Sequence, residues 1–278
     1  MQALSRRKLK LAAMDTCVSV AQQKYIKNYL INRRRISLFQ YAIFIFLLIV
    51  WEVGADLGFI DSFIFSSPTR VVRSVIDMSK DGTLFFHMGI TMLETLLSFA
   101  FVNIFGIAFA ILLWWNDNVS KVLEPYLVVL NSLPKSALAP VFIVWLGNNM
   151  KTIIIAAISV AVFGTIITLY TDFKEVEEDK VKLIRTLGGK KKDVLWRVVL
   201  PSNIPSMISL MKVNIGLSLV GVIIGEFLAA KAGLGYLIIY GSQVFKLDWV
   251  IMSIILLCIL ATVLYKGLGI IERRYGEQ

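Results

Sequence analysis

Long apolar blocks alternate along the chain with short polar and charged stretches. Six of these blocks reach the roughly 17–25 residues that a helix needs to cross about 30 Å of hydrocarbon. Inside a bilayer every backbone N–H and C=O must be satisfied within its own segment or bundle, and the alternating pattern of a membrane barrel is absent, so we expect helices. The expected spans are Ile36–Asp56, Met88–Trp115, Val122–Leu146, Ile153–Tyr170, Met207–Ala230 and Trp249–Ile271.

The polar stretch between the first two blocks predicts one further helix. The residues Ser66-Ser67-Pro68-Thr69 form a natural helix stop and restart. After this restart, apolar residues recur at helical spacing as far as Met78, which favours a short amphipathic helix along the outer membrane surface. These apolar residues are Val71, Val72, Val75 and Ile76.

Composition supports a membrane protein and indicates how the chain is organised. The 278 residues are 57% hydrophobic, with a mean hydropathy of +0.74, yet they carry a net charge of +10. A soluble domain of this length would have fewer apolar residues and would spread its charges more evenly. We therefore predict an all-α polytopic fold, with one transmembrane domain at 36–278 and a basic cytoplasmic extension at 1–35. The extension lacks the apolar stretch and cleavage site of a secretory signal.

The distribution of Lys and Arg predicts the orientation of the chain. Of the 29 such residues, 22 fall on one side of the predicted membrane, six fall on the other, and Lys135 lies within a span. The larger group includes those of residues 1–35, of the charged loop at 172–206 and of the C-terminal end. Because basic residues concentrate on the cytoplasmic side, we expect both termini and this loop in the cytoplasm.

The charged loop, residues 172–206, is too long and too patterned for a passive connector. A stripe of apolar residues in its first half predicts a short helix with one charged side. The glycine pair at 188–189 then stops that helix, and a second helix is expected over Lys190–Trp196, ended by Pro201 and Pro205. The predicted elbow is a handle for a soluble partner; the alternative is an ordinary loop whose cations face lipid head groups. The apolar stripe consists of Val181, Leu183, Ile184 and Leu187.

The spacing within this loop resembles a known family. Gly188, nine further residues and then Val198-x-Leu200-Pro201 resemble the loop by which permease subunits of bacterial ABC importers dock their ATPase. That pattern reads Glu-Ala-Ala, three residues, Gly, nine residues, Ile-x-Leu-Pro; here Lys-Leu-Ile replaces its first three residues. The resemblance implies that the following residues form the coupling loop, or coupling helix: Val181, Lys182, Leu183, Ile184, Arg185, Thr186, Leu187, Gly188, Gly189, Leu200 and Pro201.

Further motifs resemble one subfamily, the permeases for nitrate, sulfonate, taurine, bicarbonate and thiamine precursors. They are the segments LPKSALAP at 133–140, WLG at 145–147, RTLG at 185–188, GEFL at 225–228 and GLGY at 233–236. The resemblance implies the type I ABC importer permease fold, a location in the inner membrane of a bacterial cell, and transport by alternating access. It also implies a second, usually identical permease copy, two cytoplasmic ATPase subunits that use ATP and Mg, and an extracytoplasmic substrate-binding protein.

No enzymatic site can be assembled from the sequence. A phosphate-binding loop requires G-x-x-x-x-G-K-[ST], but around Gly189-Lys190 the chain has Ile184 in place of the first glycine and Lys191 in place of Ser or Thr. His87 is the single histidine, which argues against a metal cluster or a Ser-His-Asp set. Cys17 and Cys258 lie in a basic tail and an apolar span, so no disulfide framework is expected. We expect a translocation subunit that binds no cofactor, with ATP hydrolysed by a partner.

Among the charged residues within the predicted spans, three need an explanation, because a charge at mid-bilayer costs about 2.5–3.5 kcal/mol. Lys135 stands beside Pro134 in a span that we expect to be bent or interrupted there. The hypothesis is that Lys135 lines the translocation path with Asn131 and Ser136 and favours a small anion. The alternative is an internal ion pair between Lys135 and one of the other two charges, Glu94 and Glu226.

Other polar residues in the fifth span have two open interpretations. Asn214 and Ser218 are spaced i, i+4 on one face, where they either line the path or bond across helices. Glu226 joins the tentative path residues, with a packing or gating role beside Gly221 and Gly225. A positive path favours sulfonate- or nitrate-like anions, but thiamine-precursor-like and other small organic solutes stay open.

Two other classes of membrane protein remain as rivals. An ion-coupled secondary transporter would show more spans, inverted repeats and buried coupling acids in corresponding halves, none of which is evident. A membrane-embedded enzyme would need catalytic residues gathered at the end of a span. Neither rival accounts for the spacing within the charged loop.

Overall fold

The computed structural model describes residues 20–59 and 61–275, and all regular secondary structure in these two ranges is helical. The chain divides into two compact units, Met1–Thr69 and Arg70–Gln278. Residues 1–19 of the predicted basic extension lie outside the described residues, whereas its remainder, from Val20, is the first part of a long helix.

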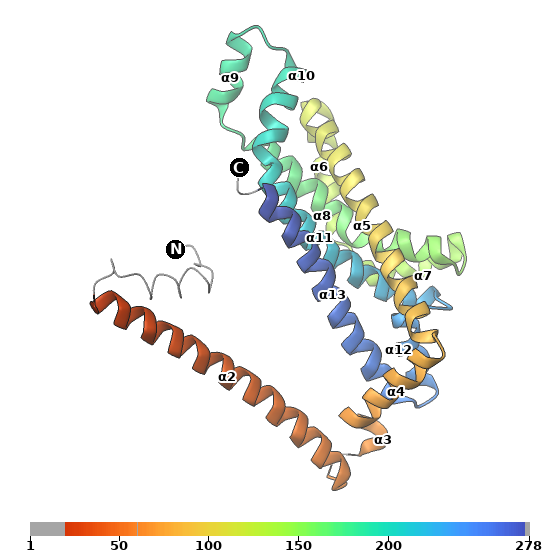
Figure 1. The fold of residues 1–278 in the computed structure, drawn as a ribbon. Coiled ribbons are helices and arrows are strands. Elements are labelled where there is room, and N and C mark those ends of the chain that lie inside the picture. The colour runs from red at the N-terminus through yellow and green to blue at the C-terminus, as the bar shows by residue number, and fades with distance from the viewer. Residues whose placement is uncertain (1–19, 60, 276–278) are drawn as a thin grey trace. The chain divides into compact units, whose positions relative to one another are not determined.

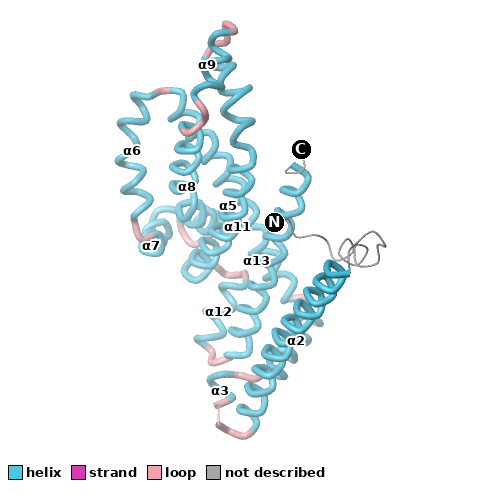
Figure 2. Tube along the Cα trace, turned by 90° about the vertical axis from the view of Figure 1, so that its left-hand side faces the viewer, coloured by secondary structure: helices cyan, strands magenta, loops and turns pink. Residues whose placement is uncertain are grey.

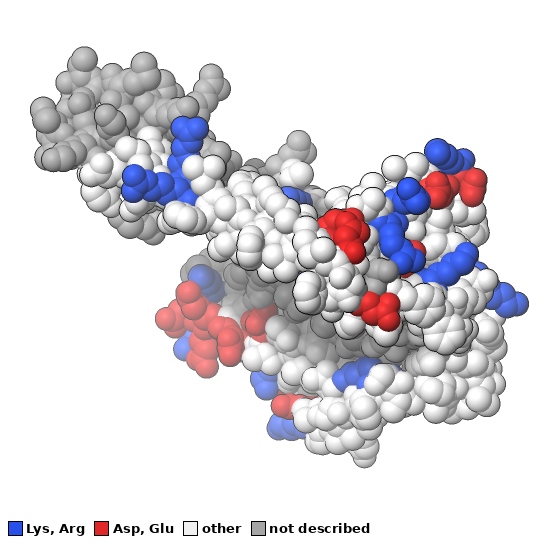
Figure 3. Space-filling view, turned by 90° about the horizontal axis from the view of Figure 1, so that it is seen from below, with Lys and Arg blue, Asp and Glu red and all other residues white. Residues whose placement is uncertain are grey.

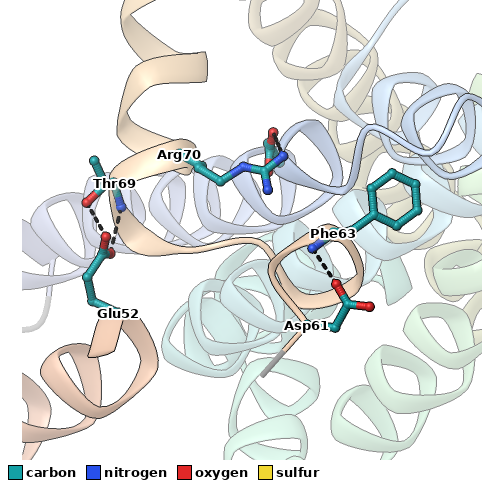
Figure 4. Close-up of polar contacts among 6 residues, drawn as sticks. Glu52, Asp61, Phe63, Thr69 and Arg70 are labelled. Atoms are coloured by element: carbon teal, nitrogen blue, oxygen red, sulfur yellow. Dashed lines mark hydrogen bonds and ion pairs between the residues drawn. The ribbon is translucent and has the colours of Figure 1, made fainter. Parts of the chain in front are cut away.

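The first unit consists mainly of the helix α2 (Val20–Asp56), followed by the single turn α3 (Ser62–Phe65). The stretch Asn28–Asp56 is long and apolar enough to cross a membrane, so the first predicted span is confirmed as a helix. Near its end, the Glu52 carboxylate accepts the Thr69 N–H at 3.0 Å and the Thr69 hydroxyl at 2.5 Å (Figure 4). These bonds tie the end of α2 to the chain where α4 begins.

The second unit is a bundle of helices that run between two ends (Figures 1 and 2). We call the end that carries α9 and α10 the loop end, and the opposite end the α12 end. The helices are α4 (Pro68–Lys80, which begins in the first unit), α5 (Thr83–Trp115), α6 (Asp117–Ser132), α7 (Lys135–Leu146), α8 (Met150–Lys174), α9 (Glu178–Thr186), α10 (Lys191–Val194), α11 (Leu200–Ala229), α12 (Leu234–Gln243) and α13 (Leu247–Tyr275).

Five helices within the described residues are long and apolar enough to cross a membrane, or six if the pair α6–α7 counts as one span. The predicted span Val122–Leu146 corresponds to the pair α6–α7, which meet at an angle of 96°. The break expected at this point is confirmed. Its cause is Pro134, which holds the residue before it, Leu133, in an extended conformation with ψ 140° and so ends α6.

Close contacts between α5, α8 and α11 form the centre of the bundle. Glycines make this possible, because a Cβ at Gly221 would lie 2.6 Å from the Cα of Ala157, and a Cβ at Gly225 would lie 2.9 Å from the Cγ2 of Ile153. Small residues allow helices to approach closely where lipid provides no hydrophobic driving force. Towards the loop end, a buried apolar cluster that includes Phe173 continues the packing.

The predicted short helix is present as α4, with Val71 and Met78 buried and Val72 and Ile76 exposed. At its start the Arg70 guanidinium pairs with Asp248 of α13 at 3.2 Å (Figure 4). Seen from below, most of the visible surface carries no charged side chain, and the charged residues gather in separate groups (Figure 3).

The prediction that Pro201 and Pro205 end the second helix of the charged loop is wrong. Residues Lys191–Ala229 form one continuous helical rod, made of α10, a π-helical turn and α11, that passes through both prolines. A π-helical turn at Leu195–Val199 lies directly before Pro201. Because proline lacks an N–H and its ring crowds the carbonyl four residues earlier, the wider turn gives the ring room without stopping the helix.

Candidate functional site

The charged loop is exposed at the loop end, beyond the ends of α5, α8 and α11 (Figures 1 and 2). No residue of α9 is buried. Leu183 and Leu187 are 60% and 75% exposed, whereas Val181 and Ile184 pack against the buried cluster that includes Val199. The apolar stripe predicted from the sequence therefore has two sides, one anchored in the bundle and one open at the tip.

Two glycines fix the turn between α9 and α10. Gly188 has φ +82°, the left-handed conformation that glycine adopts without strain, and its N–H donates to the Arg185 carbonyl at 3.0 Å. Gly189 donates to the Ile184 carbonyl at 2.9 Å, and a Cβ there would lie 2.5 Å from the Ile184 side chain. The turn is therefore closed by its own backbone and has no room for a larger residue at position 189.

The second half of the charged loop is tied to the bundle. The Lys190 N–H donates to the Asp193 carboxylate at 2.8 Å and so caps α10. The Lys191 ammonium donates to the Trp115 carbonyl at 2.7 Å, at the last residue of α5, and lies 5.4 Å from the centre of the Trp114 ring. Because Val194 and Leu195 are buried, this half of the loop is fixed to α5 as well as continuous with α11.

Lys182, which departs from the family pattern, finds its charged partners within α9. The Lys182 ammonium pairs with Glu178 at 3.1 Å and with Asp179 at 3.7 Å, and the Thr186 hydroxyl donates to the Lys182 carbonyl at 2.9 Å. Arg185 is exposed beside them. Of the last two predicted residues of the loop, Leu200 is half-buried and Pro201 is exposed. Lys182 thus contributes a positive charge on an exposed helix face.

The break between α6 and α7 brings the predicted path residues Asn131, Lys135 and Ser136 together. The Lys135 ammonium donates to the main-chain carbonyl of Asn131. The Asn131 side chain faces Gly164 of α8, where an added Cβ would lie 3.4 Å from its amide oxygen. Asn131 and Ser136 are exposed on the single chain and Lys135 is half-buried. Within the described residues, Lys135 forms no ion pair with Glu94 or Glu226, so the internal pair considered as an alternative is not present.

Asn214 lies inside the bundle and bonds across three helices. Its side-chain nitrogen donates to the side-chain oxygen Oδ1 of Asn103 on α5 at 3.0 Å, and its own Oδ1 atom accepts the Thr165 hydroxyl of α8 at 3.0 Å. Ser218, one turn further along α11, is also fully buried. Asn214 therefore bonds across helices, whereas the buried Ser218 hydroxyl has no hydrogen-bond partner among the described residues.

Glu226 is buried near the α12 end, where the sequence analysis did not foresee its partners. Its carboxylate accepts the Thr91 hydroxyl at 2.7 Å and the Gly235 N–H at 2.5 Å, and it lies against the carboxyl group of Glu94. Besides the charge of the two glutamates, a signal for this cluster was the spacing Gly233-x-Gly235, since a Cβ at Gly235 would lie 2.7 Å from the Glu226 carboxylate. Among the residues that the structure describes, no three His, Cys, Asp or Glu side chains are grouped so as to bind a metal.

Comparison with known proteins decides the family. Residues 102–276 match the family described as the binding-protein-dependent transport system inner membrane component. The chain belongs to this family. The match covers the bundle from α5 onward and includes the charged loop, so the family assigned from the loop spacing is confirmed.

Named relatives of this permease agree with that assignment. The formylaminopyrimidine transport permease protein ThiX of Halalkalibacterium halodurans is 29% identical over 195 residues, which cover 69% of this chain and 76% of that protein. The taurine transport system permease protein TauC of Escherichia coli is 25% identical over 234 residues, covering 82% of this chain and 85% of that protein. The chain is thus similar to permeases named for different solutes.

A solved structure shows the same fold. A chain of the MetNI methionine ABC transporter, in an inward-facing conformation, aligns with a TM-score of 0.59 and 17% identity. The alignment covers 68% of this permease and 94% of that chain. The predicted all-α fold of an ABC importer permease is therefore confirmed.

Together these findings establish the general role of the chain. It is a multi-pass inner-membrane permease subunit of an ABC importer for small solutes, and it is a translocation component rather than an enzyme. Permeases of such importers work with ATPase and substrate-binding partners. The two rival classes, a secondary transporter and a membrane-embedded enzyme, are set aside by the family.

Proposed function

We propose that this permease imports a small anion, sulfonate- or nitrate-like, by alternating access, and that the charged loop at 172–206 is its contact with the ATPase. The observation that supports the coupling role is the two-sided stripe of α9. Leu183 and Leu187 are exposed at the tip, while Val181 and Ile184 of the same helix pack onto the bundle. A partner that binds the exposed side would therefore move the anchored side with it.

Coupling of this kind needs contacts that differ between two states of the transporter. ATP binding would draw the loops of two permease copies together and open the path outward, and release of the hydrolysis products would reverse the change. The glycine turn at 188–189 keeps the tip rigid, because its backbone hydrogen bonds close it. Lys182, where the family pattern has Glu, would meet an acidic group of the partner.

The remaining parts of the proposal concern assembly and orientation. The excess of basic residues, 22 against six, favours both termini and the charged loop in the cytoplasm, with residues 1–35 as a basic extension at that membrane surface. The transporter would contain two copies of this chain, two ATPase subunits that bind ATP and Mg, and an extracytoplasmic protein that delivers the solute. This chain itself would bind no cofactor.

The preference for an anion depends on the break between α6 and α7. The break places the half-buried Lys135, the first residue of α7, beside Ser136 and close to Asn131 of α6. The dipole of α7 adds partial positive charge at this end of the helix. Asn214, Ser218 and Glu226 complete the tentative path residues, although in the single chain their side chains are buried among α5, α8 and α11. An anion would gain from this positive potential, whereas a neutral solute would not.

A second candidate solute is favoured by one comparison. The relative ThiX is named a formylaminopyrimidine transport permease, so a thiamine-precursor-like solute is the alternative. Uptake by the assembled transporter in vesicles, with taurine, nitrate and formylaminopyrimidine offered separately, distinguishes the two. We expect ATP-dependent uptake of an anion and its loss in Lys135→Glu. Uptake of formylaminopyrimidine alone, unchanged by Lys135→Glu, would contradict the anion proposal.

A further inference from the structure

Two carboxyl groups lie against each other inside the bundle, between α5 and α11. Glu94 and Glu226 are 2% and 1% exposed, and their side chains interact directly. Two adjacent carboxylates cannot both ionise at a buried site, because each negative charge disfavours the other and neither is hydrated. Lys135, the cation that the sequence analysis considered as a partner of either group, is bonded to Asn131 instead.

The two carboxyl groups have different surroundings. The Glu226 carboxylate accepts hydrogen bonds from the Thr91 hydroxyl at 2.7 Å, from the Gly235 N–H at 2.5 Å and from the N–H of Tyr236. A carboxylate that accepts several such bonds is stabilised in its ionised form. Glu94 has no comparable set of donors, and its Oε2 atom is buried without a hydrogen-bond partner. Because burial disfavours ionisation of both groups, the missing donors make Glu94 the member of the pair that favours its neutral form.

The neighbouring histidine does not supply the missing positive charge. His87, one turn before Thr91 on α5, accepts the Gly233 N–H at its Nδ1 atom at 3.0 Å. A ring nitrogen that accepts a hydrogen bond carries no proton, so this imidazole is neutral in the structure. Its ring stacks on Tyr236 of α12, with a distance of 6.0 Å between the ring centres.

We propose that Glu94 is a neutral carboxylic acid that shares its proton with an ionised Glu226, and that this proton holds the start of α12 against α5 and α11. Glu226 binds the Gly235 N–H, and the Thr91 hydroxyl oxygen accepts the Leu234 N–H at 2.8 Å. His87 accepts the Gly233 N–H in the same way. Side chains of α5 and α11 thus accept three successive N–H groups at the start of α12. Glu94 is thus a positioning residue for the α12 end of the permease.

The glycines of this turn fit the same arrangement. A Cβ at Gly235 would lie 2.7 Å from Oε2 of Glu226, and Gly233 has φ +118° and faces the same carboxylate. A side chain at either position would push the carboxylate away from the backbone donors. The turn is therefore built around a buried negative charge, and that charge needs a shared proton from Glu94 to be tolerated next to a second carboxyl group.

Infrared spectroscopy of the full transporter in lipid at neutral pH tests the protonation states. We expect a C=O stretching band from one protonated carboxyl group, lost in Glu94→Gln and kept in Glu226→Gln and in the exposed control Glu124→Gln. Absence of the band in the unaltered protein would overturn the proposal, even if no variant folds. Loss of the band in Glu226→Gln but not in Glu94→Gln would also overturn it.

Hydrogen exchange tests the positioning role. The side-chain amide of Glu94→Gln can still donate to Glu226, so exchange of the backbone amides at 234–236 should stay within about twofold of the unaltered protein. Glu226→Gln should accelerate their exchange by roughly tenfold or more, since it removes a charged acceptor. Equal acceleration in both variants would show that Glu94 supports the fold without acting as a neutral donor. Neither measurement depends on which solute is transported.

Discussion

The ammonium group of Lys191 donates a hydrogen bond to the main-chain carbonyl of Trp115 across 2.7 Å, joining the charged loop to the last residue of α5. These residues are 76 positions apart in the sequence. Because Lys191 also begins the rod that continues as α11, a displacement of the loop acts on two helices of the central bundle at once. The contact is therefore a candidate route for force between the ATPase and the path.

Replacement of Lys191 tests this route. Lys191→Met removes the donor but keeps the length of the side chain, whereas Lys191→Arg keeps a donor and serves as the matched control. The bond is partly exposed, so its loss should cost about 0.5–1.5 kcal/mol and reduce ATP-driven uptake roughly two- to tenfold. ATPase binding should stay unchanged in both variants. Equal uptake by Lys191→Met and the unaltered transporter would show that the bond carries no coupling.

The exposed tip of α9 gives a second prediction. Leu187→Asp places a charge where the proposed ATPase contact would be apolar, and loss of one buried leucine is worth about 1.5–3 kcal/mol. Co-purification of the ATPase should fall roughly tenfold or more. Leu57, 66% exposed in the first unit, provides the matched control Leu57→Asp, which should retain the ATPase. Full retention by Leu187→Asp would remove the tip from the interface.

A third prediction concerns two glycines on the same helix. A Cβ at Gly221 would lie 2.6 Å from the Cα of Ala157, whereas a Cβ at Gly216 has no neighbour within 4 Å. Backbone atoms cannot move aside as a side chain can, so Gly221→Ala should destabilise the bundle by about 1–3 kcal/mol. Gly216→Ala should be neutral or slightly stabilising, since alanine favours the helix. Thermal unfolding in detergent measures both, and equal melting temperatures would contradict the packing described here.

The positive charge at the helix break gives a fourth prediction. Lys135→Glu reverses the charge beside the proposed path and should reduce anion uptake by roughly tenfold or more, the effect of one repulsive contact of about 1.4 kcal/mol. Lys151→Glu, at an exposed position at the start of α8, is the control and should transport normally. Assembly with the ATPase is measured in parallel. Normal uptake by a fully assembled Lys135→Glu transporter would exclude the anion path.

The sequence predicted the helices well, because long apolar blocks leave few alternatives in a membrane. It also predicted the break at Pro134 and the glycine turn at 188–189, since both residue types restrict the backbone in known ways. It failed at Pro201, where the rule that proline ends a helix was overridden by a π-helical turn that tolerates the ring.

Polar contacts inside the bundle were not predictable to the same extent. Asn103 and Thr165 carry no charge and occur singly in apolar segments, so nothing in the sequence shows that both meet Asn214. Glu94 and Glu226 stood out by their charge, but 132 positions separate them in the chain. Only the packing of α5 against α11 shows that they lie against each other.

The continuous rod Lys191–Ala229 has a consequence for the distance over which the permease can respond. At 1.5 Å per residue, its 39 residues span about 58 Å, more than the thickness of the hydrocarbon layer. A stiff helix of that length works as a lever, so a tilt of a few degrees beside the ATPase would shift Glu226 by several ångströms at the opposite membrane face. The π-helical turn, five residues long and inside the charged loop, is the natural fulcrum for such a tilt.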